Sequence, residues 1–148
     1  MSNMNESNEV KIQFKSFSIN ESFARTAVSS FFAQLNPTVS DITDLKTAVS
    51  EAVTNCIVHA YKDSIGTIYI TLKILNQNTA YIKIRDKGCG IEDISQAMQP
   101  LFTTSPNDDR AGIGFAVMQS FTDKLKVSSS LGKGTTVIMT KQLRTREQ

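Results

Sequence analysis

The chain has 148 residues, of which 40% are hydrophobic, and this size and composition suit one folded domain over residues 1–148. Its 16 basic and 14 acidic residues give a formal charge of +2 and are scattered along the sequence, so direct nucleic-acid binding has little electrostatic support. A signal peptide and a membrane-length apolar run are absent, and two cysteines make no disulfide framework. These features predict a cytoplasmic protein whose partners are proteins or a nucleotide, not a membrane.

Both ends of the sequence are expected to be disordered. Residues 1–9 are rich in Asn, Ser and Glu and lack apolar partners, and residues 144–148 are polar. Apolar and polar residues alternate over residues 10–15, which predicts a half-buried strand as the first element.

Two amphipathic helices are predicted after this strand. Asn20 is a candidate cap for the first helix, which ends before Pro37. Ser40 or Asp41 is a candidate cap for the second helix, whose apolar face continues to about Tyr61. Each helix therefore has one side suited to packing against a sheet.

The second half of the chain predicts two hairpins with a helix between them. Alternating patterns over residues 68–74 and 80–84 form the first hairpin, residues 112–121 form the helix, and residues 124–130 and 135–142 form the last hairpin. This order of elements predicts an α+β fold. We expect a two-layer sandwich in which helices cover one face of a mixed, mostly antiparallel sheet.

Polar residues at a spacing of four mark the edge of the second helix's apolar stripe. Successive helical residues turn by about 100°, so Glu51, Asn55 and His59 form one row. Taken alone, such a row is most simply a solvated helix surface. His59, the only histidine, is more simply a structural residue at the cleft margin than a phosphoacceptor.

Two glycine-bearing segments follow this row, DKGCG at 86–90 and GIG at 112–114. Glycine lets the backbone approach a ligand closely, and a glycine loop that leads into a helix presents N–H groups to phosphate. The Asp86 carboxylate can accept a hydrogen bond from an adenine amino group, although an ordinary turn would use the same residues. Neither segment fits the Rossmann pattern, and Lys133 does not fit a P-loop.

The polar stretch over residues 103–110 lacks periodicity and is predicted to be a mobile lid over a triphosphate. Thr104 lies within it as a candidate phosphate contact. Arg110 is a candidate to meet the γ-phosphate, the alternative being an exposed loop arginine. In the last turn, Thr135 would supply a hydroxyl and close backbone on the adenine side.

In their order and spacing, these segments resemble the Bergerat (GHKL) fold, the ATP-binding fold shared by gyrase B, Hsp90, MutL and histidine kinases. The resemblance implies that Glu51 is the catalytic base and that Asn55 binds the Mg²⁺ that bridges the phosphates. ATP or ADP would then be contacted by the metal ligand Asn55 and by Asp86, Gly88, Gly90, Thr104, Arg110, Gly112, Gly114 and Thr135.

NESFAR at 20–25, VSEAVTN at 49–55 and RAGIGF at 110–115 narrow the resemblance. They are similar to the anti-sigma-F factors, the stage II sporulation protein AB family, over most of the chain. The resemblance implies a homodimeric serine kinase that holds a sporulation sigma factor inactive and phosphorylates a serine on its anti-anti-sigma antagonist. Glu21 and Arg25 would lie on the surface that both partners share, with Arg25 projecting outward.

Other functions stay open at this point. A nucleotide-gated module could sequester the sigma factor without kinase turnover, or an equivalent switch kinase could serve another sigma factor. Glu51 favours turnover. A molecular clamp is disfavoured because we expect no second domain after Leu143, and a histidine kinase because we expect no phosphoacceptor helix upstream. The dimer interface is not determined, although the first strand, with Ile12 and Phe14, is a candidate pairing edge.

Overall fold

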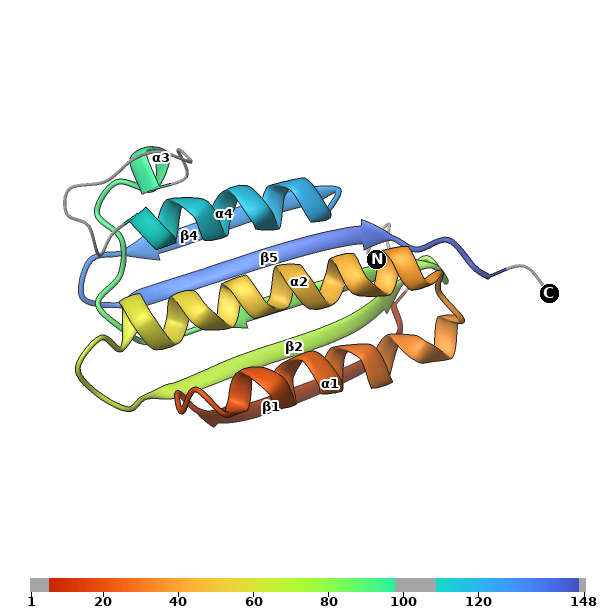
Figure 1. Cartoon of the computed structure of the whole chain (residues 1–148), viewed down its shortest axis with the longest axis horizontal. Coiled ribbons are helices and arrows are strands. Elements are labelled where there is room, and N and C mark those ends of the chain that lie inside the picture. The colour runs from red at the N-terminus through yellow and green to blue at the C-terminus, as the bar shows by residue number, and fades with distance from the viewer. Residues whose placement is uncertain (1–5, 98–108, 147–148) are drawn as a thin grey trace.

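The computed structural model describes residues 6–97 and 109–146 of the chain. These residues form five strands and four α-helices, with a short 3₁₀ turn and a π-helical turn (Figure 1). In chain order these elements are β1 (Glu6–Lys15), α1 (Asn20–Phe32), the 3₁₀ turn η1 (Ala33–Leu35), α2 (Val39–Asn55), the π turn η2 (Cys56–Ala60), β2 (Thr67–Leu75), β3 (Thr79–Arg85), α3 (Ile94–Ala97), α4 (Asp109–Phe121), β4 (Lys124–Ser130) and β5 (Gly134–Gln142).

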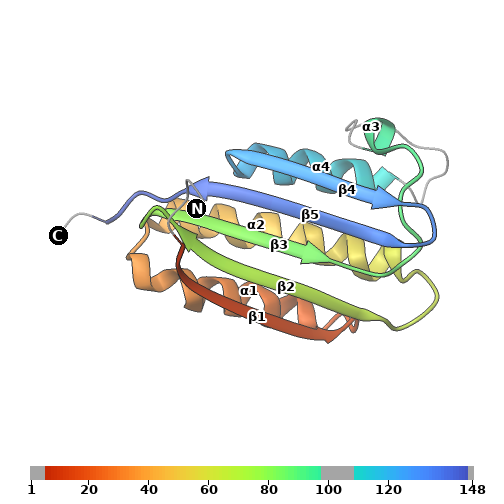
Figure 2. The same ribbon diagram turned by 180° about the vertical axis from the view of Figure 1, so that it is seen from behind.

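The strands form one sheet with the order β1-β2-β3-β5-β4. All four pairings between the described strands are antiparallel. The sequence predicts a mixed, mostly antiparallel sheet, and the word mixed does not apply to these strands. Helices α1, α2 and α4 lie side by side over one face, and Figure 2 shows the strands from the other face with the helices behind them. The predicted two-layer α+β sandwich is confirmed.

The core lies between the sheet and this helix layer. Every second residue of β2 and β3 is buried, because successive strand side chains point to opposite faces of a sheet. The largest fully buried side chains come from both layers: Val28, Phe32, Leu45, Val49, Val53 and Met118 from the helices, and Ile68, Ile70, Leu72, Ile82, Ile84 and Met139 from the strands. None of the helices in the described ranges is both long and apolar enough to span a bilayer.

The helix caps differ from those predicted. Thr38 caps α2 in place of Ser40 or Asp41, and its hydroxyl accepts a hydrogen bond from the Asp41 backbone N–H at 3.2 Å. Asn20 is the first residue of α1 rather than its cap, and its side-chain amide donates to the carbonyl of Lys15 at 2.9 Å. The predicted caps lie one residue after the observed cap of α1 and two or three residues after that of α2, which is the usual precision for a boundary predicted from sequence.

Both predicted tails contribute ordered residues. Strand β1 includes residues 6–9, which were expected to fray. After β5, the Arg144 backbone N–H and guanidinium donate to the Asp41 carboxylate at 2.7 and 2.9 Å, and Pro37 forms an isolated bridge with Thr145. Arg144 and Thr145 are therefore fixed near the start of α2 by polar contacts that composition does not reveal.

Candidate functional site

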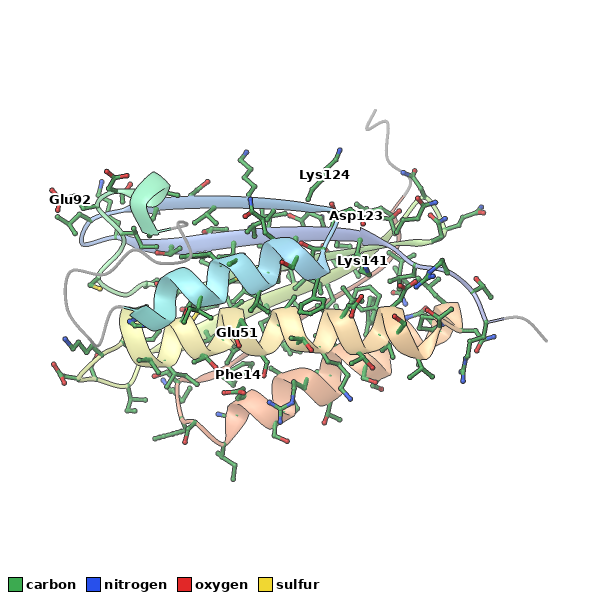
Figure 3. All side chains as sticks on the ribbon, turned by 45° about the horizontal axis from the view of Figure 1, so that its top comes forward. Phe14, Glu51, Glu92, Asp123, Lys124 and Lys141 are labelled. Atoms are coloured by element: carbon green, nitrogen blue, oxygen red, sulfur yellow. The ribbon has the colours of Figure 1, made fainter. Side chains whose placement is uncertain are left out.

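Glu51 and Asn55 lie one turn apart on α2 and face the first half of α4. Figure 3 shows Glu51 on α2, beside α4. A Cβ atom at Gly114 of α4 would lie 3.1 Å from Asn55 Oδ1, 3.2 Å from Asn55 Nδ2 and 3.3 Å from Glu51 Oε2. The second glycine of the GIG segment thus lies against both polar side chains, and the structure brings these three predicted residues together.

The Asn55 amide has an unusual environment. Both Oδ1 and Nδ2 are buried, and neither has a hydrogen-bond partner within the described part of the chain. A buried amide that makes no hydrogen bond costs about 1–3 kcal/mol. Such a group is expected where a ligand completes the site, and an amide oxygen is a suitable ligand for Mg²⁺.

A complete metal cage is not formed by protein side chains here. Within residues 6–97 and 109–146, no group of three or more His, Cys, Asp or Glu side chains could hold a metal ion. Mg²⁺ usually keeps several waters and takes phosphate oxygens in addition to one or two protein oxygens. The single oxygen of Asn55 therefore fits a metal that arrives with a nucleotide.

Asp86 lies at the end of β3 and is 5% exposed. Its Oδ1 accepts hydrogen bonds from the backbone N–H groups of Gly88, at 2.9 Å, and Thr135, at 3.1 Å. Among the described residues, its Oδ2 accepts only from the Cys56 thiol, at 3.5 Å. Burial raises the pKa of the Asp86 carboxyl, and these three hydrogen bonds oppose that shift. Oδ2 is therefore the oxygen with capacity for a further donor.

The loop after Asp86 packs against the end of the helix that carries Asn55. A Cβ atom at Gly88 would lie 2.3 Å from the Ala60 carbonyl oxygen, and the Cys89 N–H donates to that oxygen at 3.1 Å. Gly90 has φ +78°, in the left-handed region, and a Cβ atom there would lie 2.1 Å from the Ser130 carbonyl oxygen. Both glycines are required by the backbone contacts around them.

The helix does not continue regularly from Asn55 to Tyr61 as predicted. Residues Cys56–Ala60 form a π turn, in which the Tyr61 N–H donates to the Cys56 carbonyl at 3.0 Å. Turns of this kind occur often at functional sites. The π turn interrupts the regular α-helical geometry on which the predicted row of Glu51, Asn55 and His59 rests. The turn ends at Ala60, whose carbonyl accepts the hydrogen bond from the Cys89 N–H in the loop after Asp86.

Further residues of the site were not predicted from the sequence. Cys56 was assigned to the apolar stripe, yet its thiol contacts Asp86, and burial raises the pKa of that thiol well above its ordinary value. The Tyr61 hydroxyl accepts from the Lys87 N–H and donates to the Thr67 carbonyl at 2.7 Å. Neither role follows from local spacing, because the contacts of Cys56 with Asp86 and of Tyr61 with Lys87 join segments far apart in the sequence.

The remaining predicted phosphate contacts are only partly described. Gly112 and Arg110 lie within α4, which begins three residues earlier than predicted, so Arg110 belongs to a helix rather than to the lid. Thr104 lies outside the described residues. Thr135 is buried at the start of β5, and its hydroxyl is 2.7 Å from that of Ser129.

Glu21 and Arg25 of α1 join a polar network with α2. Arg25 Nη1 donates to Glu21 Oε1 and to Ser50 Oγ, both at 2.9 Å, and Ser50 Oγ donates to Glu21 Oε1 at 2.7 Å. Thr54 Oγ1 donates to Glu21 Oε2 at 2.9 Å. The prediction of an outward-projecting Arg25 is therefore wrong in part, since its side chain is 36% exposed and its guanidinium lies against α2.

Comparisons with known proteins identify the family of this chain. Residues 20–141 match the histidine kinase-like ATPase domain family. An anti-sigma F factor of Caldanaerobacter subterraneus subsp. tengcongensis is 56% identical over 140 residues, which cover 95% of this chain and 97% of that protein. The anti-sigma F factor of Bacillus subtilis is 48% identical over 137 residues, which cover 92% and 93%.

Two solved structures have the same fold. The RsbU and RsbW domains of Rv1364c from Mycobacterium tuberculosis match with a TM-score of 0.68 and 19% identity, over 93% of this chain and 33% of that one. The mycobacterial sensor histidine kinase MprB matches with a TM-score of 0.57 and 15% identity, over 93% and 100%. Sequence and fold together show that this chain belongs to the anti-sigma F factors, within the histidine kinase-like ATPase domain family.

Proposed function

We propose that this protein is an ATP-dependent protein serine kinase and anti-sigma factor. It would sequester a sporulation sigma factor of the sigma-F type and phosphorylate a serine on the anti-anti-sigma protein that opposes it. The observation that carries this proposal is the convergence at Gly114 of the Glu51 carboxylate and of the Asn55 amide, which has no hydrogen-bond partner among the described residues. The names of the relatives support the assignment of partners.

Each residue of the site would have a separate task. The Asp86 carboxylate selects adenine, because its Oδ2 can accept a hydrogen bond from the exocyclic amino group. Asn55 Oδ1 holds Mg²⁺, which neutralises charge on the transferred phosphoryl group when bound. Glu51 accepts the proton of the acceptor serine hydroxyl, a contribution typically worth about 10²- to 10⁴-fold in rate.

The partner surface is connected to this chemistry through α2. Ser50 and Thr54, which bond to Glu21, are the residues that precede Glu51 and Asn55. A sigma factor or an antagonist that binds Glu21 and Arg25 would therefore contact the same helix that holds the base and the metal ligand. This arrangement favours one shared surface over two separate docking sites.

We expect the protein to act as a homodimer in the cytoplasm. Strand β1 is at one edge of the sheet, so its outer backbone groups have no strand partner within the described residues. Pairing of two such edges would give a closed twofold interface. Light scattering at increasing protein concentration measures this directly, and a monomer at all concentrations would contradict it.

The kinase proposal is tested by transfer of labelled phosphate from ATP to a candidate antagonist in a single turnover. Glu51→Gln is expected to bind Mg-ATP normally but to transfer phosphate at least about a hundredfold more slowly. Glu9→Gln, an exposed residue of β1, is the matched control and is expected to match the unmodified protein. If the unmodified protein binds a sigma factor in the presence of nucleotide but transfers no phosphate, it is a binding module and the kinase proposal is wrong.

A further inference from the structure

The sheet face opposite the helices, here called the open face, is strongly basic. Because alternate strand residues are buried against the helices, the intervening residues project from the other side. Lys124, for example, extends away from the helix layer in Figure 3. The cations of the open face are Lys11 and Lys15 of β1, Lys73 of β2, Lys83 and Arg85 of β3, Lys87 directly after β3, and Lys124 and Lys126 of β4.

This face holds half of the 16 Lys and Arg residues of the chain. Among the described side chains on the five strands, its one acidic residue is Glu9, whose carboxylate is 3.4 Å from Lys73 Nζ. Three of the cations, Lys11, Lys83 and Lys126, lie in one row across the sheet. Lys11 pairs with Thr71, Thr71 with Lys83, Lys83 with Ile138, and Ile138 with Lys126, so one row crosses all five strands.

Two tyrosine rings lie among these cations on the adjacent strands β2 and β3. The Lys73 ammonium is 5.3 Å from the ring centre of Tyr81. Arg85 and Lys87 are 5.8 and 5.2 Å from the ring centre of Tyr69. Aromatic rings surrounded by cations, on a sheet whose other face is covered by helices, are the elements with which proteins bind unpaired bases and their phosphates.

Other occupants fit this face poorly. Stable protein interfaces have apolar or aromatic centres depleted of lysine. Membrane surfaces are bound through apolar side chains that insert, and none of the exposed large apolar side chains of the described residues belongs to a strand. A second copy of the chain would bring two positive faces together.

The shape of the face indicates the form of nucleic acid. Five strands at 4.7–4.9 Å spacing make a face roughly 20–24 Å wide, and the major groove of a duplex is about 12 Å wide. The sheet cannot enter that groove, so bases can reach the tyrosines only when they are unpaired. We propose that the open face binds single-stranded nucleic acid, mainly through phosphate contacts and without sequence preference.

Fluorescence anisotropy with a labelled 20-nucleotide oligo-dT tests this on the full chain. If the face neutralises four to five phosphates, the slope of log K against log salt is about −3, which weakens binding about 60-fold between 50 and 200 mM NaCl. Lys83→Glu with Lys126→Glu removes two cations of the row that crosses the sheet. This double variant is expected to bind at least about tenfold more weakly at 50 mM salt, with a slope shallower by at least about 1.4.

Lys46→Glu with Lys62→Glu is the matched control, because it changes the net charge equally at positions outside the open face. Equal loss of binding in both double variants would show a general charge effect and overturn the proposal. Lys83→Gln with Lys126→Gln gives a milder second variant in case the charge reversal unfolds the sheet, and circular dichroism confirms the fold. This neutral variant is expected to bind more weakly than the control.

Intrinsic fluorescence distinguishes nucleic acid from other polyanions. The chain has no tryptophan and three tyrosines, two of which lie on the open face. Stacking of bases on Tyr69 and Tyr81 is expected to quench tyrosine emission as oligo-dT is added. Poly-glutamate that binds as tightly as oligo-dT would assign the face to an acidic protein, and a duplex of equal length that binds more tightly would rule out a single-strand site. Either result would overturn the proposal.

Discussion

Substitution of Gly114 by Ala is expected to separate fold stability from nucleotide binding. The new Cβ atom would lie 3.1–3.3 Å from the polar ends of Asn55 and Glu51, closer than ordinary van der Waals contact. The Asn55 amide has no hydrogen bond within the described residues to hold it, so it can yield by a few tenths of an ångström. Since Gly114 is inside α4, alanine also removes the helix penalty of glycine, about 1 kcal/mol.

The two effects have opposite signs. The free energy of unfolding of the ligand-free protein is expected to rise by up to about 1 kcal/mol, which raises Tm by about 2–4 °C for a domain of this size. Mg-ATP affinity is expected to fall about tenfold or more, because Asn55, the proposed metal ligand, is displaced. Phosphate transfer is expected to fall further, since misplacement of a catalytic group by about 1 Å can cost about a hundredfold in rate.

Thermal unfolding without ligand, calorimetry with Mg-ATP and single-turnover transfer measure the three quantities. Ala116→Gly, on the same helix, is the matched control and should lower Tm while it leaves Mg-ATP affinity unchanged. If Gly114→Ala binds Mg-ATP and transfers phosphate as the unmodified protein does, the cluster at Gly114 is not the nucleotide site.

Three further variants test other parts of the structure. Asn55→Ala should abolish magnesium-dependent ATP binding in calorimetry and leave the urea midpoint nearly unchanged, because the amide makes no hydrogen bond within the described residues. Arg144 holds the pKa of the buried Asp41 carboxyl below its ordinary value, so this group stabilises the fold above about pH 4 and loses that effect as pH falls through the lowered pKa. Asp41→Asn should therefore lower the urea midpoint at pH 7, and a difference that stays constant down to pH 3 would contradict this account. Arg25→Ala should weaken the complexes with the sigma factor and the antagonist by about 2 kcal/mol each in titrations. Its ATP affinity should not change, because Ser50 and Thr54 still bond to Glu21.

The strands, the helices and part of the site could be predicted because their signals are local. Alternation over β2 and β3 indicated the hairpin, and residues four apart on one helix placed Glu51 next to Asn55. The contact between the Cys56 thiol and Asp86 joins positions 30 residues apart, so no local pattern indicates it. The Ala60 carbonyl at the end of the π turn accepts from the Cys89 N–H, a contact between distant segments that no local pattern indicates.

The basic residues are distributed differently along the sequence and in the folded structure. Along the chain the basic residues are scattered, and this argued against nucleic-acid binding. Residues such as Lys83 and Arg85 occupy alternate positions of a strand, and Lys126 on another strand lies in the same row. Because alternate residues of a strand point to the same face, basic residues that are separated in the sequence lie together on one face of the sheet. Their positions along the sequence alone do not show this.

The strand order has a consequence for how this protein is made. β5 is synthesised after every other strand, yet it lies in the interior of the sheet, between β3 and β4. At about 5–20 residues per second, roughly 3–11 s pass between synthesis of Arg85 and of Gln142. During that time β3 has an unpaired edge, and β4 has no neighbour to join. A nascent chain that pauses in this interval exposes an aggregation-prone edge, so synthesis rate and chaperone access should affect the yield of folded protein.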